Sequence, residues 1–281
     1  MKKAALINDI SGLGNCSLIA GISVISAFGV QPIPMPTAVL SAQTEYVDYY
    51  CRPMTEAMPQ FTANWKKHGE NFDGILTGFF ADPKQAEYAL EFIEEFHRED
   101  TLLLVDPVMG DGAETYDNYS EELLAQIRLM AAKADIVTPN ITELCLLAGE
   151  DAAKIVNLDC DSRMSEVRRI ARRYFEETGC TLVVTGVESK GAGGEKLTGN
   201  LVIGEGLCEY SAYPLVPLRF TGAGDLLAAT LMGGRLNGME WKELLDLAGG
   251  FIYKAAEAAL ESGRTTNEGS SFQQHLYMLT K

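Results

Sequence analysis

The segment Phe220–Ala229 holds the residues with the clearest chemical potential: a glycine-flanked turn followed by an aspartate where an apolar helix begins. Gly222 and Gly224 let the backbone approach a ligand closely, and the free N–H groups at a helix N-terminus attract phosphate oxygens. Asp225 beside such a site could take a proton from a hydroxyl that attacks a phosphoryl group. The segment alone fits equally well a simpler role, in which Asp225 only caps the helix.

Two further aspartates bracket a turn that follows an apolar run. Asp106 and Asp111 enclose the residues Pro-Val-Met-Gly. Mg²⁺ prefers oxygen ligands and is commonly held by one or two carboxylates together with substrate phosphates. The two aspartates therefore indicate a magnesium site, and a solvated acidic loop is the alternative.

The segment Thr138–Glu143 places Asn140 after another apolar run and Glu143 three residues later. This spacing predicts a helix start, with Asn140 as the cap and Glu143 completing a capping box. A role in the site is compatible with the cap, because a carboxylate near a metal can also orient a water on it.

Short apolar runs alternate with longer amphipathic ones, which predicts strands that alternate with helices. The predicted strands are Ala4–Ile7, Ile33–Leu40, Gly74–Phe80, Thr101–Val105, Asp135–Thr138 and Thr181–Thr185. The predicted helices are Ser17–Phe28, Met54–His68, Pro83–Arg98, Tyr119–Lys133, Ile141–Gly149 and Ser165–Gly179. Later, Gly199–Glu205 and Leu207–Tyr213 are predicted to form a strand meander after a mobile loop, Gly191–Gly194.

Several runs are apolar at consecutive positions, such as Leu102–Val105, as expected of strands that are covered on both faces. We therefore predict a three-layer α/β/α fold with a central, mostly parallel sheet, formed as one domain over residues 1–281. Ligands of such folds gather at the carboxyl ends of the strands. Polar residues follow the predicted strands there: Asn8-Asp9, Thr77–Phe79, Asp106–Asp111, Thr138–Asn140 and Thr185-Gly186.

Composition excludes several classes of function. The net charge of −16 opposes binding to nucleic acid or to anionic membranes. No apolar run is long enough to span a bilayer, and the apolar run after Met1-Lys2-Lys3 is too short for a secretory signal. The six cysteines are scattered and contain no Cys-x-x-Cys pair, so free thiols in a cytoplasmic protein are expected.

Four motifs occur in a fixed order: Asp-Pro-Val-Met-Gly-Asp, Thr-Pro-Asn-x-x-Glu, Val-Thr-Gly and Gly-Ala-Gly-Asp. This order resembles the pyridoxal kinases and related vitamin kinases of the ribokinase-like superfamily. The resemblance extends from the first strand to the helix after Asp225. It implies an ATP-dependent kinase that phosphorylates the 5′-hydroxymethyl group of pyridoxal, pyridoxine or pyridoxamine.

The resemblance also implies a role for each matching residue. Asp225 would be the catalytic base. The other implied roles are an anion hole of Gly222, Ala223 and Gly224, an ATP side of Asn140, Thr185, Gly186 and Thr221, and metal and phosphate contacts from Asp106, Asp111 and Glu143. ATP and Mg²⁺ are the implied cofactors, and some relatives need a monovalent cation. Relatives that lack a lid commonly form homodimers.

On the substrate side, Ser41–Tyr46 resembles the Ser-Asn-His-Thr-Gly-Tyr segment of pyridoxal kinases, with Thr44 at the ring-contacting threonine. Phe79 matches an aromatic residue that lies against the pyridine, and a plain core phenylalanine is the alternative. Three positions depart from the family pattern: Asp9 stands where many members have a serine, Gln43 replaces a histidine, and Ala223 replaces a hydroxyl-bearing residue. An aspartate near the ring could pair with a protonated ring nitrogen or an amine.

Two other functions stay open. Hydroxymethylpyrimidine kinases of the same superfamily act on a similar aminated ring, and a catalytically silent vitamin or nucleotide binder could use the same fold. Sugar kinases fit less well, because the sequence between Gln31 and Tyr50 shows no counterpart of their lid or early glycine pair. The chain also lacks a P-loop, a nucleophile elbow and a full dinucleotide-binding fingerprint.

Overall fold

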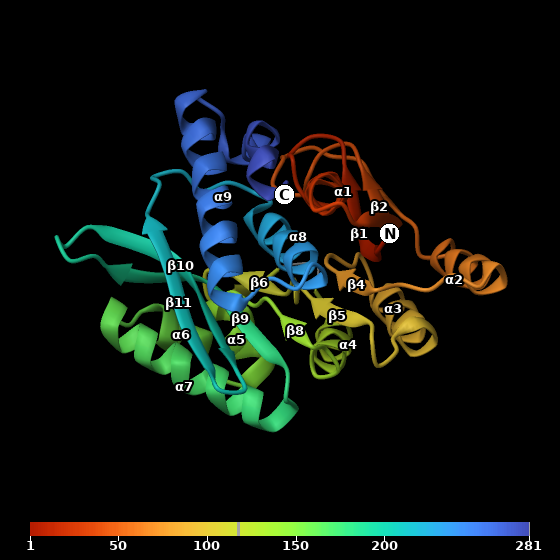
Figure 1. Cartoon of the computed structure of the whole chain (residues 1–281), viewed down its shortest axis with the longest axis horizontal. Coiled ribbons are helices and arrows are strands. Elements are labelled where there is room, and N and C mark those ends of the chain that lie inside the picture. Colours follow the sequence, from red (N-terminus) through yellow and green to blue (C-terminus); the bar gives the residue numbers. More distant parts are fainter. Residues whose placement is uncertain (117–118, 281) are drawn as a thin grey trace.

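The protein was analysed as a computed structural model, which describes residues 1–116 and 119–280. A nine-stranded sheet forms its middle layer, in the order β11-β10-β9-β8-β5-β4-β1-β2-β3 (Figure 1). Its strands are β1 (Lys3–Ser11), β2 (Gln31–Leu40), β3 (Cys51–Pro53), β4 (Gly74–Thr77), β5 (Leu102–Val105), β8 (Ile136–Val137), β9 (Thr181–Lys190), β10 (Lys196–Gly204) and β11 (Leu207–Pro214). A separate hairpin pairs β6 (Gly110–Asp111) with β7 (Glu114–Thr115).

Helices cover both faces of the sheet (Figure 1). One face carries α1 (Ser17–Ala27), α8 (Ala223–Leu236) and α9 (Trp241–Glu261). The other carries α2 (Met58–His68), α3 (Pro83–Phe96), α4 (Glu121–Ala131), α5 (Ile141–Ala148), α6 (Ala152–Val156) and α7 (Cys160–Thr178). Two 3₁₀ segments, η1 (Thr266–Glu268) and η2 (Phe272–Leu279), follow α9.

The two-sided covering explains the sequence of the central strands. Ala4–Ile7 of β1 are fully or almost fully buried, and alternate residues enter the core clusters on opposite faces. Strands β2, β1, β4, β5, β8 and β9 run parallel, so their carboxyl ends meet at one rim. The predicted three-layer, mostly parallel fold is confirmed. No helix in the described ranges is both long and apolar enough to cross a bilayer.

Strand β9 lies between a parallel neighbour, β8, and an antiparallel neighbour, β10. It pairs antiparallel with β10 from Leu182 to Lys190 along one edge, with an irregular register around Thr185, and parallel with β8 along the other edge at Thr181 and Leu182. Gly186 has a φ of 67°, a left-handed conformation that suits glycine. The sequence placed the end of the strand at Thr185, which is where this irregularity lies. Gly191–Gly194 forms the tip of the β9–β10 hairpin.

Several predicted boundaries are wrong: β9 ends at Lys190 and not Thr185, β4 ends at Thr77 and not Phe80, and β10 begins at Lys196 and not Gly199. Asn8 and Asp9 lie inside β1 and not after it, because β1 continues to pair with β2 beyond them. Helix α2 begins at Met58 and not Met54, with a proline in its first turn. Helix α7 begins at Cys160 and not Ser165, because the Asp159 carboxylate caps it by accepting from two backbone N–H groups.

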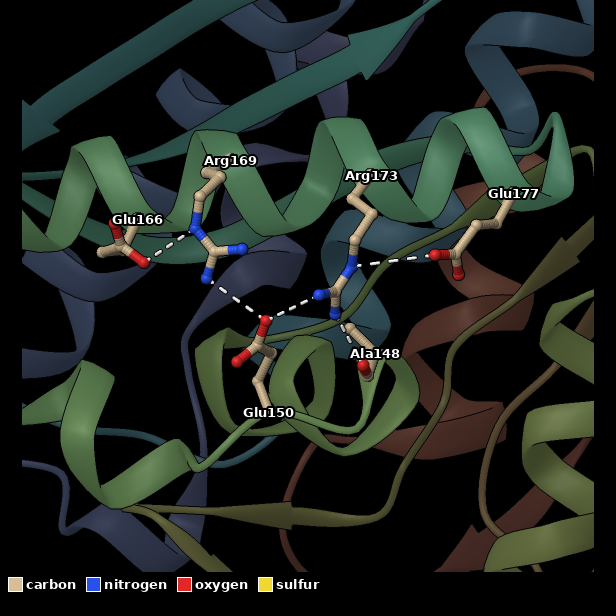
Figure 2. A network of polar contacts seen from close by, with 6 residues as sticks. All are labelled: Ala148, Glu150, Glu166, Arg169, Arg173 and Glu177. Atoms are coloured by element: carbon tan, nitrogen blue, oxygen red, sulfur yellow. Dashed lines mark hydrogen bonds and ion pairs between the residues drawn. The ribbon is translucent and has the colours of Figure 1, made fainter.

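The short helix α5 is held at its C-terminal end by arginines (Figure 2). Arg173 donates to the carbonyl of Ala148 (2.7 Å) and pairs with Glu150, which also pairs with Arg169. Cations at a helix C-terminus satisfy its free carbonyl groups and complement its dipole. The network therefore fixes α5, whose other end reaches the rim of the sheet.

Candidate active site

Asp225 lies in the first turn of α8, at the rim where the parallel strands end. The helix follows Gly222, which has a φ of 91° and makes no side-chain cap. The first N–H group with a partner inside the turn belongs to Leu226, which donates to the carbonyl of Gly222 (3.0 Å). The N–H groups of Ala223 and Gly224 therefore precede the hydrogen-bonded part of the helix and are placed to meet an anion.

The carboxylate of Asp225 does not cap its own helix. One oxygen accepts from the Asn8 amide (2.9 Å) and the other from the backbone N–H of Ser17 (2.8 Å). Ser17 has a φ of 53° and Asn15 a φ of 51°, a region that non-glycine residues rarely occupy. This strained start of α1 directs an N–H group at Asp225, so two separate segments orient the aspartate.

Burial raises the pKa of Asp225 to about 6. The negative charge of Asp9 contributes to this increase, while the hydrogen bonds from Ser17 and Asn8 limit it. A general base works best when its pKa lies near the operating pH. Asp225 is therefore ionised at neutral pH and basic enough to accept a proton.

Asn8 connects this base to the substrate side of the site. Its side-chain oxygen accepts from the N–H groups of Phe79 and Asp9, each at 2.9 Å. Gly78 makes room for the amide, because a Cβ there would lie 2.6 Å from the Asn8 side chain. The Asn8 amide thus makes three hydrogen bonds, which fix the positions of Asp225, Phe79 and Asp9.

Asp106 follows β5 and lies close to the start of α8. Thr138 donates to its Oδ1 (2.9 Å), and its Oδ2 would lie 3.6 Å from a Cβ at Gly224. Burial raises the pKa of Asp106 to about 7, and the charge of Asp225 adds to the increase. Oδ2 therefore faces the turn that could bind a phosphate.

Glu143 and Asn140 form the predicted capping box at the start of α5. The two Glu143 oxygens accept from the N–H groups of Asn140 (2.8 Å) and Met109 (3.1 Å). Burial raises the pKa of Glu143 well above its ordinary value, and the charge of Asp106 raises it further. Glu143 therefore completes the predicted helix cap and is also an acidic group beside Asp106.

Asp111 is engaged elsewhere. It lies in the hairpin β6–β7 and forms an ion pair with Arg219, whose segment leads into the glycine turn. Within residues 1–116 and 119–280, no three His, Cys, Asp or Glu side chains converge to hold a metal ion. The structure does not bring Asp106, Asp111 and Glu143 together as one cage.

The residues present nevertheless fit a Mg²⁺ ion that a phosphate helps to hold. The Oδ2 of Asp106 faces the anion-binding turn, and Asp106 and Glu143 carry charges that repel each other in a buried place. A cation would stabilise both ionised carboxylates. Mg²⁺ commonly takes only one or two protein carboxylates and completes its shell with water and phosphate.

A cavity of about 280 Å³ opens beside the start of α8. Thr185 and Gly186 of β9 line it together with Gly224, and the rings of Tyr213 and Tyr253 stack at 5.7 Å on its wall. Such aromatic, mostly apolar walls suit a planar ring. Two predicted ATP-side residues, Thr185 and Gly186, therefore lie next to the predicted anion hole.

The other two predicted ATP-side residues are not in the cavity lining. Asn140 donates to the carbonyl of Gly110 (2.8 Å), which fastens the hairpin β6–β7 to α5. The hydroxyl of Thr221 donates to the carboxylate of Glu45 (3.1 Å), which lies in the loop predicted to contact the substrate. Thr221 therefore connects the glycine turn to that loop.

Asp9 is buried and its carboxylate accepts from the hydroxyl of Ser11 (2.8 Å). Burial raises its pKa. The ring of Phe79 is half-buried near Tyr119 at a centroid distance of 6.4 Å and belongs to neither core cluster, unlike its neighbour Phe80. The arrangement therefore fits a ligand contact better than a core role for Phe79.

Thr44 is exposed in the loop between β2 and β3. Its neighbour Gln43 is buried, accepts from the N–H of Glu45 (2.8 Å), and donates to the carbonyl of Asn267 near η1 (3.4 Å). The segment around η1 thus supports the loop, although the sequence pattern assigned that segment no role.

Sequence reasoning missed several groups of the site. Asn8 was noted only as a polar residue, and its link to Asp225 crosses 217 positions of the chain. The direction of the Ser17 N–H depends on a backbone conformation that the residue types do not predict. Tyr119 and Arg219 belong to no sequence motif, although each lies next to a segment that contains one.

Comparison with known proteins agrees with this geometry. The phosphomethylpyrimidine kinase family model matches residues 14–269. A candidate phosphomethylpyrimidine kinase of Bacteroides thetaiotaomicron, solved in one crystal form with pyridoxal, is 31% identical and superposes with a TM-score of 0.89 over 99% of this chain and 95% of that one. Pyridoxal kinase of Leishmania donovani in complex with ADP, at 20% identity, shares the fold with a TM-score of 0.81, covering 99% of this chain and 96% of its own.

Among curated relatives, the pyridoxal kinase of Rubrobacter xylanophilus is 28% identical. The alignment covers 67% of this chain and 63% of the relative, so the chain spans less than two thirds of that protein's length. The pyridoxal kinase of Pseudomonas putida is 24% identical over 86% of this chain and 82% of its own. The chain therefore belongs to the phosphomethylpyrimidine kinase family and has the ribokinase-like fold.

Proposed function

We propose that the protein is an ATP-dependent kinase that phosphorylates the 5′-hydroxymethyl group of pyridoxal, pyridoxine or pyridoxamine. The observation that carries the proposal is the position of Asp225. Its carboxylate, with a pKa of about 6, is oriented by Asn8 and by the Ser17 N–H beside a helix start whose N–H groups remain available. The similarity to a protein solved with pyridoxal supports the substrate class.

In this proposal Asp225 takes the proton from the substrate hydroxyl as its oxygen attacks the terminal phosphorus of ATP. The N–H groups of Gly222, Ala223 and Gly224 stabilise the charge on the transferred phosphoryl group. The fixed position of Asp225 contributes by alignment, since a base held by two hydrogen bonds need not search for the hydroxyl.

Asp106 and Glu143 are the proposed protein contacts of a Mg²⁺ ion and its water shell. When bound, the ion would neutralise charge on the phosphates of the nucleotide. The remaining ATP contacts are assigned to Thr185 and Gly186 in the cavity wall, and to Asn140 and Thr221 through the segments that they fasten.

At the substrate end we assign the ring contact to Phe79 and the recognition of a polar ring substituent to Asp9, with Thr44 in the covering loop. A buried aspartate with a raised pKa gains most from a positively charged partner, which restores the charge that burial disfavours. A protonated ring nitrogen or the amine of pyridoxamine would supply that charge.

A hydroxymethylpyrimidine kinase is the second candidate. The matching family model carries the name of phosphomethylpyrimidine kinase, and the substrate of such an enzyme is likewise a flat, aminated ring with a hydroxymethyl group. Asp9 and Phe79 suit that ring by the same physical arguments. The two candidates share the phosphoryl-transfer chemistry and differ in the ring pocket.

The release of ADP from Mg²⁺·ATP should be measured with each of the three vitamers, with hydroxymethylpyrimidine and with a panel of sugars. The proposal expects the highest kcat/KM with a vitamer. A higher kcat/KM with hydroxymethylpyrimidine would establish the second candidate. Binding of a vitamer without any turnover would contradict both and indicate a silent binder.

We further propose that residues 1–281 act as one catalytic domain and that two chains assemble into a homodimer. The first part is supported by the single sheet that runs between the two helical layers. The second rests on the family resemblance and on the absence of a strand between Leu40 and Cys51 that could serve as a lid. Sedimentation of the purified protein at several concentrations would test the assembly.

A further inference from the structure

The candidate site is short of positive charge. The charge of Asp225 raises the pKa of Asp106, the charge of Asp106 raises the pKa of Glu143, and the whole chain carries a net charge of −16. A nucleotide would bring several more negative charges. Backbone N–H groups and one Mg²⁺ ion offset part of this repulsion, and a side-chain cation would offset more.

Arg219 is the only positively charged residue among the described residues that line the cavity beside α8. It lies three positions before Gly222, in the segment that joins β11 to α8. The same cavity wall includes Ala223 and Gly224, whose N–H groups form the proposed anion hole. The Arg219 guanidinium and those backbone N–H groups therefore come from the same segment of the chain.

The partner of Arg219 is Asp111, in the hairpin on the other side of the site. Both side chains are largely accessible, with 70% and 41% of their surface exposed. An ion pair so exposed contributes little to stability, because water screens it and two flexible side chains must be held still. Breaking this ion pair, so that Arg219 can bind a stronger anionic partner, therefore costs little free energy.

We propose that Arg219 binds the phosphates of the nucleotide, and that Asp111 positions it in the free protein. Phosphate is the stronger partner for a guanidinium, since two parallel N–H···O bonds can form to an anion of higher charge. Asp111 is then a positioning residue and not a metal ligand. This inference rests on the proposed use of ATP, and it assigns the phosphate contact to a residue outside the four sequence motifs.

The test compares the affinities of adenosine, AMP and ADP, measured by calorimetry with and without Mg²⁺, in the wild type and in Arg219→Gln. We expect ADP to bind about tenfold more weakly or worse in the variant, since a charge-assisted contact is lost. Adenosine should bind within about twofold of wild type, because it has no phosphate. Arg219→Lys should recover part of the loss. Arg172→Gln removes the same charge from the exposed surface of α7 and should change nothing.

A second variant separates the two roles of Asp111. In EDTA, Asp111→Asn should bind ADP at least as tightly as the wild type, because Arg219 no longer has a competing partner. Weaker ADP binding by Asp111→Asn in EDTA would overturn the positioning role. Equal losses for adenosine and ADP in Arg219→Gln, or no loss at all, would overturn the phosphate contact.

These outcomes differ from a failure of the proposed function. If the wild type binds no ADP and releases none from ATP with any substrate, then the kinase assignment fails and this inference fails with it. If the wild type turns over ATP and Arg219→Gln has an unchanged KM for ATP, then only the inference about Arg219 is wrong.

Discussion

Helices α5 and α8 both begin at the rim where the parallel strands end, and they begin in opposite ways. The start of α5 is closed by its own side chains, since Asn140 and Glu143 satisfy each other's backbone N–H groups. The start of α8 has no side-chain cap, and the carboxylate in its own first turn, that of Asp225, is turned toward Asn8 and Ser17.

The difference shows how one structural feature can serve either stability or binding. A capped helix start contributes to folding, because its N–H groups are used internally. An open helix start gives up that contribution and keeps the N–H groups for an anion. The presence of an acidic residue in the first turn does not distinguish the two cases, since both helices have one.

The largest expected effect follows from replacing the base. Asp225→Asn should lower kcat by about 10²- to 10⁴-fold, the usual range for general-base catalysis, while ADP still binds. Steady-state kinetics and ADP calorimetry would measure both. Asp151→Asn makes the same change at the capped start of α6 and should leave kcat unaltered. A variant at Asp225 with near wild-type kcat would show that this carboxylate is not the base.

The next-largest effect should come from distorting the glycine turn at the open start of α8. Gly222→Ala places a methyl group 2.9 Å from the Cβ of Cys16 at a φ of 91°, so the turn must shift. We expect kcat/KM to fall by about tenfold or more, by analogy with the loss of a donor from an oxyanion hole.

Gly238→Ala is the matched control for the glycine turn. It also has a positive φ, of 75°, but a methyl group there meets nothing within 4 Å. It should cost about 1 kcal/mol of stability and leave kcat/KM nearly unchanged. Equal kinetic losses in the two variants would mean that backbone strain, and not the anion hole, explains the first.

A smaller effect should appear in the pH dependence. Because the pKa of Asp225 is raised to about 6, the base is ionised above that pH, and kcat/KM should fall as the pH drops through about 6. Asn8→Ala removes a hydrogen bond that lowers this pKa, so the acid limb should move to higher pH. If the acid limb does not shift in Asn8→Ala, then this limb does not report the ionisation of Asp225.

The smallest effect tests the closed helix start. Asn140→Ala removes the cap of α5 and should lower the free energy of unfolding by about 1 kcal/mol, whereas Asn140→Ser should retain most of it. Thermal and urea unfolding of the three proteins would measure the difference. Equal stabilities would mean that the cap contributes nothing in solution and that the contrast with α8 is one of geometry alone.

The sequence was sufficient to predict the sheet and much of the site. Consecutive apolar residues in β1 and β5 identified strands covered on both faces, and the spacing of Asn140 and Glu143 predicted the capping box. These features are local, because each depends on residues within one strand or one turn. Asp225 could be predicted as the candidate base for the same reason, since its glycine turn and its helix are adjacent in the chain.

The rest depended on contacts that a local pattern does not contain. The sequence could not show that Asn8 holds Asp225, or that Arg219 reaches Asp111 across the site. It also placed no structure after α8, whereas Gln43 contacts Asn267 beyond α9. Strand β9 also continues to Lys190, past the point at which its apolar run ends, as the antiparallel partner of β10.

The hydrogen bond between Asn8 and Asp225 has a consequence for how the candidate site forms. During synthesis on the ribosome, the first strand emerges 217 residues before the aspartate that it must hold. Until the segment bearing Asp225 has been made, the Asn8 amide lacks this partner and the candidate base is missing from the rim of the sheet. The proposed base therefore gains this hydrogen bond only after the segment bearing Asp225 has been synthesised and has packed against β1.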